Sequence, residues 1–254
     1  MSLSFVSLNS GSNGNCYYVG NEQDAVIIDA GISCRETIRR MSRLGLDLMK
    51  VRAVFISHEH SDHTRGVEVL SRKMNIPVFI TAATHNQSNL RIALSLLQYF
   101  GPNEKISFGS LVVEPFTKRH DAADPCSFVI SYNGLNVGVM TDIGSACEQV
   151  KAQFSRCNAA FLEANYDEQM LEQSFYPYYL KKRIRSDYGH LSNDQALELF
   201  SNHRSSGLKH LVLSHLSKVN NRPELVRELF GRHANGTVIS IASRYEESAV
   251  FSVA

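Results

Sequence analysis

The chain has 254 residues, of which 43% are hydrophobic and 20% are charged, and its formal net charge is +1. These values are ordinary for a globular enzyme built from one large domain or two small ones. A near-neutral balance excludes a global attraction to nucleic acid or to an anionic membrane, so any polyanion binding would have to come from a local patch.

The first half of the chain predicts strands that alternate with helices. Residues 9–15 form a turn between the first two strands and are rich in Asn, Ser and Gly, which tolerate positive φ. We expect strands at residues 3–8, 16–19, 25–29, 51–56 and 78–81, and helices at residues 35–44, 66–74 and 84–99.

The second half continues in the same style. We expect strands at residues 111–116, 127–131, 135–140, 159–163, 210–213, 237–241 and 248–253, and helices at residues 147–154, 178–184, 193–202 and 223–230. No low-complexity linker, charge block or compositional break marks a domain boundary. We therefore predict one domain over residues 1–254, of the α/β class, with the layers of a four-layer αββα sandwich.

The cysteines and the amino-terminal residues indicate the cellular compartment in which the protein is expected. The five cysteines are odd in number and widely spaced, and no C-x-x-C pair occurs, so reduced thiols in a cytoplasmic protein fit best. Cys126 and Cys157 have strand-like apolar neighbours and are expected to be small core residues. No secretory signal is visible at the start, and no apolar stretch approaches the ~20 residues that span a bilayer.

Residues 58–63 read His-Glu-His-Ser-Asp-His and follow directly on an apolar, β-branched run. This pattern is typical of a buried strand that delivers metal ligands to a loop at its carboxyl end. In an extended loop His58 and His60 project to the same side and can bind one ion, whereas Asp62 and His63 can turn toward a second ion. We therefore predict metal-dependent chemistry at a two-metal site.

A purely structural interpretation of this cluster is weaker. A single His on a strand is usually packed or solvent-facing. Crowded imidazoles, however, repel one another when protonated and are costly to bury neutral and unpaired, and a divalent cation removes both costs by taking the lone pairs. Glu59 and Ser61 alternate away from the ligands and are expected to be spacers or loop hydrogen-bonding residues. The remaining candidates are expected to be ordinary surface or packing histidines: His85, His203, His210 and His233.

Other strand ends supply the ligands that such a site still needs. His120 follows a predicted strand after a short polar turn, and Asp142 stands where the strand at 135–140 meets a loop. His215 repeats the apolar-Ser-His pattern that precedes the cluster, and Asp29 ends an apolar run in the same way. Each of these has an equally good structural interpretation when taken singly. Together they are hard to explain without a metal.

These residues resemble the metallo-β-lactamase superfamily. Its pattern is an early Asp, then H-x-H-x-D-H, a later His, an Asp and a final His, and this order is complete here over most of the chain. The resemblance implies His58, His60 and His120 on one metal ion, Asp62, His63 and His215 on a second ion, Asp142 bridging both, and Asp29 ordering the ligand loop from outside the coordination sphere.

Two ions about 3.5–4 Å apart can lower the pKa of a water and clamp a phosphoryl or carbonyl oxygen, so no Ser or Cys nucleophile is needed. A bridging Asp142 and the retained His63 resemble the phosphodiesterase and thioesterase branches more than the true β-lactamases. Antibiotic hydrolysis is therefore not expected. The donor set suits Zn²⁺, Mn²⁺ or Fe²⁺ and does not select among them.

Finer motifs resemble one subgroup, the YycJ/WalJ-like proteins. The matching segments are residues 10–15, 120–122, 162–167, 189–193, and 213–217 with 220–221. The resemblance implies a cytoplasmic hydrolase that acts on DNA as an exonuclease, with a link to mismatch repair. In the early Gly-rich loop, Ser12 and Asn13 would present backbone N–H groups to a phosphate. The alternative is that this loop is a plain turn.

Two further features are candidates for substrate contact. His190 precedes a predicted helix and, as a His outside the ligand set, could protonate a leaving oxygen, so catalysis is assigned to Asp62 and His190. The alternative for His190 is a role in loop structure only. The densest basic run follows three tyrosines and could bind phosphates and stack bases, unless it is a solvated helix face: Lys181, Lys182, Arg183 and Arg185.

Three functions remain open at this point. The first is a two-metal phosphodiesterase that acts on DNA. The second is a hydrolase of a small substrate, either a cyclic phosphodiester or a thioester of the glyoxalase-II kind, which the near-neutral charge favours and the basic Tyr-rich segment opposes. The third is a non-catalytic binding scaffold, whose signature would be missing ligands, and none is missing here.

Overall fold

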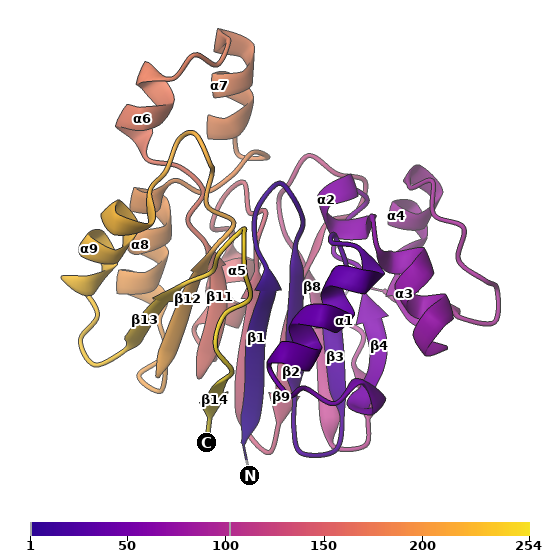
Figure 1. Cartoon of the computed structure of the whole chain (residues 1–254). Helices are drawn as coiled ribbons and strands as arrows, with labels where there is room; N and C mark the ends of the chain where they lie inside the picture. Colours follow the sequence, from indigo (N-terminus) through magenta and orange to yellow (C-terminus); the bar gives the residue numbers. More distant parts are fainter. Residues whose placement is uncertain (1, 102) are drawn as a thin grey trace.

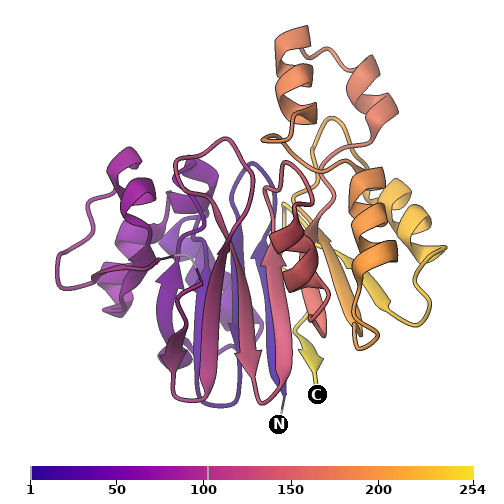
Figure 2. The same cartoon turned by 180° about the vertical axis from the view of Figure 1, so that it is seen from behind.

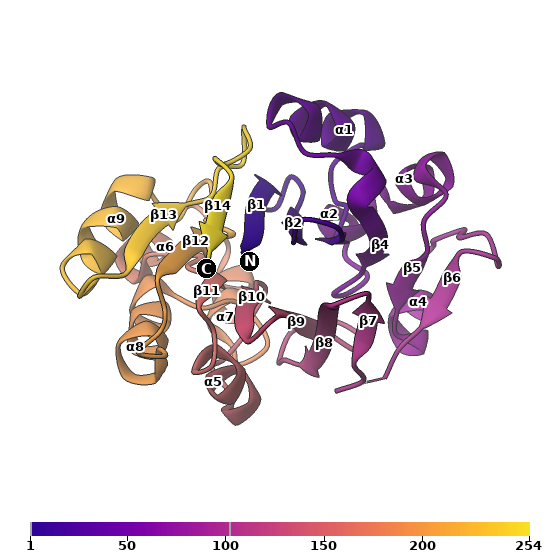
Figure 3. The same ribbon diagram turned by 90° about the horizontal axis from the view of Figure 1, so that it is seen from below.

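The computed structural model describes residues 2–101 and 103–254, which form two seven-stranded sheets packed face to face (Figures 1 and 3). The first sheet has the order β14 (Phe251–Val253), β1 (Leu3–Asn9), β2 (Cys16–Gly20), β3 (Ala25–Ile28), β4 (Val51–Phe55), β5 (Val78–Ile80), β6 (Leu97–Tyr99). The second has the order β13 (Val238–Ile241), β12 (His210–Ser214), β11 (Ala159–Glu163), β10 (Leu135–Met140), β9 (Cys126–Tyr132), β8 (Leu111–Thr117), β7 (Ile106–Phe108).

Helices cover both outer faces, which confirms the predicted α/β sandwich (Figures 1 and 2). Helices α1 (Cys34–Arg43) and α3 (Val67–Met74) lie on the first sheet, with α2 (Ser61–Thr64) and α4 (Ala82–Gln87) beside its upper edge. Helices α5 (Glu148–Phe154), α8 (Asn193–His203) and α9 (Pro223–Gly231) lie on the second, while α6 (Glu168–Gln173) and α7 (Tyr178–Arg185) project above it. No helix within the described residues is long and apolar enough to cross a membrane.

The alternation of side chains along the strands builds three hydrophobic layers. In β1, Leu3 and Phe5 belong to the cluster between the sheets, whereas Val6 and Leu8 face the layer under α1 and α3. The second sheet follows the same rule, since Val212 points to the central cluster and its neighbours point to α5, α8 and α9. Successive strand side chains lie on opposite faces, so each buried strand serves two layers.

Several elements differ from the sequence-based expectation. The predicted helix at 84–99 is wrong: α4 stops at Gln87, and after a coil Leu97–Tyr99 forms β6, parallel to β5. Pairing with the open edge of β5 overrides the helical pattern of this apolar segment. The pairing costs little burial, because leucines of the segment still pack against the layer under the first sheet. The one-turn helix α2, helix α6 and strand β7 were not expected.

The direction of the strands brings one set of ends together. Strands β3 and β4 run parallel, as do β10, β11 and β12, and β8 runs in the same direction as β10 because both are antiparallel to β9. The carboxyl ends of parallel strands meet at one edge of a sheet, which is where open α/β folds place their ligands. This edge is the upper one in Figure 1, below α6 and α7.

Candidate metal centre

Each side chain of the centre follows a strand end. Asp29 follows β3, Asp142 follows β10 and His215 follows β12, and these three residues have positive φ values of 58°, 54° and 56°. A left-handed backbone is uncommon outside glycine, although Asp and His adopt it more readily than bulky residues do. Such backbone strain clusters at functional sites.

The first group of potential ligands is formed by His58, His60 and His120. One nitrogen from each lies within 4.8 Å of the others, and Nε2 of His58 is 3.1 Å from Nδ1 of His60. His58 and His120 are buried, and His60 is partly exposed toward the pocket. The structure therefore brings together the three histidines that the sequence assigned to one ion.

The second group is formed by Asp62, His63 and His215, whose ligand atoms also lie within 4.8 Å of one another. Oδ2 of Asp62 is 3.5 Å from Nε2 of His63 and 3.7 Å from Nε2 of His215. Asp62 and His63 lie on α2, which is held against the loop between β1 and β2 because the Asn15 N–H donates to the Asp62 carbonyl oxygen at 2.7 Å. The two residues thus lie on a short helix rather than in an extended loop, and the ring of His63 still packs against that of His58, with centroids 4.0 Å apart.

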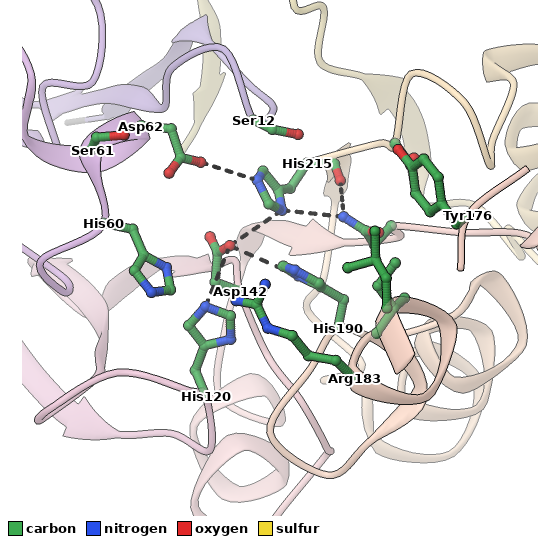
Figure 4. Close-up of a pocket in the computed structure, with 14 residues that line it drawn as sticks. Ser12, His60, Ser61, Asp62, His120, Asp142, Tyr176, Arg183, His190 and His215 are labelled. Carbon is green, nitrogen blue, oxygen red and sulfur yellow. Dashed lines mark hydrogen bonds and ion pairs between the residues drawn. The ribbon is translucent and has the colours of Figure 1, made fainter. Parts of the chain in front are cut away.

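Asp142 stands between the two groups, as Figure 4 shows. Its Oδ2 is 3.2 Å from Nε2 of His63, and its Oδ1 is 3.9 Å from Nε2 of His120 and 3.3 Å from Nδ1 of His215. Asp142 also shares a possible ligand group with His58 and His63. A carboxylate in this position is able to bridge two ions.

Three of the buried histidines have a polar contact at Nδ1 that holds the ring. Nδ1 of His63 is 2.7 Å from Oδ2 of Asp29, and Nδ1 of His120 is 3.0 Å from the carbonyl oxygen of Gly189. Nδ1 of His215 lies 3.0 Å from Oε1 of Glu163. Such contacts fix the ring orientation and leave Nε2 for a metal, a recurrent arrangement at protein metal sites.

Unpaired buried atoms show that the site fits a cation. Nε2 of His120, Nε2 of His215 and Oδ2 of Asp142 are buried and have no hydrogen-bond partner among the described residues. Buried polar atoms without partners are rare because each costs about 1–3 kcal/mol. All three atoms are imidazole or carboxylate donors that face the same space, so a divalent ion would satisfy them together.

The electrostatics agree with this fit. Burial lowers the pKa of His58 well below its usual range and lowers the pKa of His120 to about 4, so both rings are neutral with a free lone pair. Burial also opposes the charged form of His63 and His215, yet the Asp142 carboxylate and its acidic neighbours outweigh it. The pKa of His63 is held well above its usual range, and the pKa of His215 is raised to about 10. The carboxylates of the centre therefore favour positive charge.

Glu163 was not predicted as a site residue. It is fully buried at the end of β11, and its Oε1 contacts Nδ1 of both His190 and His215, at 2.7 and 3.0 Å. Its Oε2 accepts from the backbone N–H groups of Ile143 at 2.7 Å and Leu191 at 3.3 Å. Burial opposes ionisation, but the two histidines dominate and hold the pKa of Glu163 at about 2. The available signal was a carboxylate ending an otherwise apolar strand, the pattern that identified Asp29.

The pocket beside the centre has a volume of about 400 Å³ (Figure 4). Among the candidates from the sequence, Ser12, Arg183 and His190 line it together with His60 and Asp62. The side chain of His190 is 20% exposed, and its ring is anchored at Nδ1 by Glu163. His190 therefore lies next to the predicted ligands, and its ring is accessible from the pocket.

The remaining substrate-binding candidates lie outside this pocket. The Asn13 side-chain amide donates to the Arg244 carbonyl oxygen at 2.8 Å, and Lys181 donates to the Glu172 carbonyl oxygen. Arg185 pairs with two glutamates of α6. Lys182 is exposed on α7 and is not among the residues that line the pocket. Arg183 reaches the pocket wall while paired with Asp121 at 2.5 Å.

The other residues discussed in the sequence analysis fall into simple roles. Glu59 accepts from the backbone N–H of Ala123 at 2.9 Å, in keeping with a loop hydrogen-bonding role. Cys126 and Cys157 are buried and free, as expected for core residues. His210 is a packing residue against Phe251, with ring centroids 4.2 Å apart.

Comparison with known proteins identifies the family. Residues 25–216 match the family described as the beta-lactamase superfamily domain. The chain belongs to this family. It is 35% identical to Exodeoxyribonuclease YycJ of Bacillus anthracis over 230 residues, and this alignment covers 89% of this chain and 87% of that protein. It is 31% identical over 223 residues to Exodeoxyribonuclease WalJ of Streptococcus pneumoniae serotype 2, with 86% and 83% covered. The superfamily and the YycJ/WalJ-like subgroup indicated by the motifs are thus confirmed.

Solved structures of other proteins share the fold. The metallo-beta-lactamase fold protein YhfI from Bacillus subtilis aligns with a TM-score of 0.77 at 14% identity, with 99% of both chains covered. Zn²⁺-bound PqqB from Methylobacterium extorquens aligns with a TM-score of 0.74 at 14% identity over the same share of each chain. Identities this low show the shared architecture alone.

Proposed function

We propose that this protein is a metal-dependent exodeoxyribonuclease that uses two divalent ions. The observation that carries the proposal is the arrangement of two three-residue donor groups on either side of Asp142. The relatives named exodeoxyribonucleases, which cover most of the chain, supply the substrate class. A role linked to mismatch repair and a cytoplasmic location, which the free cysteines favour, belong to the same proposal.

We assign one ion to His58, His60 and His120 and the other to Asp62, His63 and His215, with Asp142 as a ligand of both. Ions held there would lower the pKa of a water and neutralise charge on the phosphoryl oxygens. Zn²⁺, Mn²⁺ and Fe²⁺ all suit these donors. Asp29 keeps the ring of His63 in place through Nδ1.

Asp62 and His190 face the pocket from opposite sides (Figure 4). The Asp62 carboxylate accepts a hydrogen bond from the Asn15 side-chain amide at 3.2 Å, which orients it to accept a proton from the attacking water. The protonated form of His190, held at Nδ1 by Glu163, donates its Nε2 proton to the leaving oxygen. Each group is thus assigned one proton transfer.

A substrate panel tests the proposal. Purified protein is loaded with Zn²⁺, Mn²⁺ or Fe²⁺, assayed for metal content, and given end-labelled DNA, bis-p-nitrophenyl phosphate and an acyl-glutathione. We expect DNA to be degraded from an end and the thioester to be left intact. Efficient hydrolysis of the acyl-glutathione with inert DNA would instead support the small-substrate alternative.

Variants assign the residues. Asp62→Ala should abolish nuclease activity, which excludes a contaminating nuclease. His190→Ala should lower kcat by about 10²–10⁴-fold with metal content intact. The matched control is His203→Ala, because His203 stands at the end of α8 outside the donor groups. Wild-type activity of His190→Ala would remove His190 from the mechanism.

A further inference from the structure

A second pocket of about 360 Å³ lies beside the metal centre. Its walls are the loop after β12, the start of α9 and the segment that follows β13. Ser217 lines both this pocket and the first one, so the two adjoin across that residue. In Figure 1 the segment after β13 rises beside the loop between β1 and β2, at the edge of the sandwich that carries the centre.

The charge of this second pocket is mainly positive. Lys218, Arg227 and Arg244 line it, against a single acid, Glu246. None of the three cations forms an ion pair with a residue that the structure describes, although Arg244 lies 3.5 Å from an amide oxygen of Asn13. The basic run of α7 differs, because its arginines are neutralised by acidic partners. Three cations without an ion-pair partner among the described residues therefore lie together in this pocket.

An aromatic ring is presented at the same place. Tyr245 is 71% exposed, while its carbonyl oxygen accepts from Nη2 of Arg40 at 2.9 Å. The preceding backbone is fixed to the Gly-rich loop, because the Ser10 N–H donates to the Ser243 carbonyl oxygen at 3.1 Å. A rigid backbone that exposes a tyrosine ring offers a stacking surface at low entropic cost.

We propose that the second pocket binds the polynucleotide strand next to the scissile phosphodiester, with Lys218, Arg227 and Arg244 on its phosphates and Tyr245 stacked on a base. This inference rests on the proposed nuclease function. Cationic grooves with aromatic rings are how proteins hold single strands without sequence preference. The volume also falls in the range of ligand pockets, about 300–1,000 Å³.

The test neutralises the three cations together as Lys218→Gln/Arg227→Gln/Arg244→Gln. The matched control, Arg35→Gln/Arg72→Gln/Lys73→Gln, removes three exposed cations from α1 and α3, on the other sheet. Binding of a cleavage-resistant phosphorothioate single strand to the metal-loaded protein is measured across a salt series. We expect the first variant to flatten the slope of log K against log[salt] by about 2, and the control to keep the wild-type slope.

Substrate length separates this inference from the proposed function. The loss of kcat/KM in the triple variant should grow from less than threefold for bis-p-nitrophenyl phosphate to more than thirtyfold for a single-stranded 12-mer. An unchanged salt slope, an equal effect in the control, or an equal loss on both substrates would each overturn the inference. Failure of the wild-type protein to cleave any phosphodiester would instead overturn the nuclease function.

Tyr245 gives an independent readout. Tyr245→Ala should weaken single-strand binding by about tenfold through lost stacking, whereas Tyr245→Phe should keep wild-type affinity. The salt slope should be the same in both variants, since no charge is removed. Equal affinity of the Ala and Phe variants would exclude a base at this position.

Discussion

The substitution Glu163→Gln tests how the centre is held in place. Oε1 of Glu163 faces Nδ1 of His190 and His215, and Oε2 accepts from two backbone N–H groups. A glutamine has only one acceptor oxygen, so its NH₂ group must face either the two imidazoles or the two backbone donors. Facing the backbone, the NH₂ group meets two donors, and facing the imidazoles it forces a change of tautomer; because the side chain is fully buried, bulk solvent does not reach it.

The magnitude follows from these contacts. A hydrogen bond to a charged group contributes about 1.5–3 kcal/mol, and a buried unsatisfied donor costs a similar amount. If the amide faces the histidines, His215 must accept at Nδ1, which places its proton on Nε2 and removes a metal lone pair. We expect metal affinity to fall by about 10–100-fold. We expect kcat/KM on DNA to fall by at least ~10²-fold, since His190 loses its anchor as well.

The assay is a chelator competition that yields the metal dissociation constant, together with kinetics at saturating metal. The matched control is Glu114→Gln, another buried carboxylate, whose partner Arg156 lies 2.9 Å away and outside the donor groups. Metal affinity and kcat/KM of Glu163→Gln within threefold of wild type would refute the reasoning. If Glu114→Gln lost as much metal affinity and kcat/KM, the losses would come from neutralising any buried carboxylate and not from the contacts of Glu163.

Three further predictions concern stability. Gly31→Ala should destabilise the fold and lower metal affinity, because a Cβ there would lie 1.6 Å from the Asp62 carbonyl oxygen. Gly231→Ala, at the end of α9 with open space around it, should be at least as stable as wild type in urea. Chelation should lower Tm, since ions that bind only the folded state stabilise it, and re-addition of Zn²⁺ should restore it; an unchanged Tm would contradict a built metal site. Burial lowers the pKa of His210 to about 4, below its unfolded value, so the unfolded state takes up the proton first as pH falls. From pH 6.5 to 4 the wild type should therefore lose roughly 1–3 kcal/mol more unfolding free energy than His210→Phe. Urea titrations that give the same loss of unfolding free energy for both proteins would disprove this.

The candidate ligands can be picked out from the sequence because they follow a simple rule. His58, Asp142 and His215 each stand where an apolar strand ends, and parallel strands carry their ends to one edge. A polar residue at the end of an apolar strand can therefore be placed at this edge even when the loops between the strands are unknown. Glu163 obeys the same rule but was overlooked, since no partner for it is visible until the strand order is known.

Features that depend on distant partners were not predictable. The segment at 84–99 has helical periodicity, yet its end becomes β6 because β5 offers an unpaired edge. The basic residues of α7 looked free, but Asp121 and the glutamates of α6 neutralise two of them. In the same way, Lys218, Arg227 and Arg244 are scattered in the sequence and become neighbours only where the loop after β12, helix α9 and the segment after β13 meet.

The left-handed corners at Asp29, Asp142 and His215 constrain how this protein can change. Each corner costs of order 1–3 kcal/mol in backbone energy, and glycine would relieve that cost. The same replacement would delete the carboxylate or imidazole that the turn presents. A screen for thermal robustness should therefore recover glycine at these corners in inactive clones, whereas a screen for turnover should retain the strained residues.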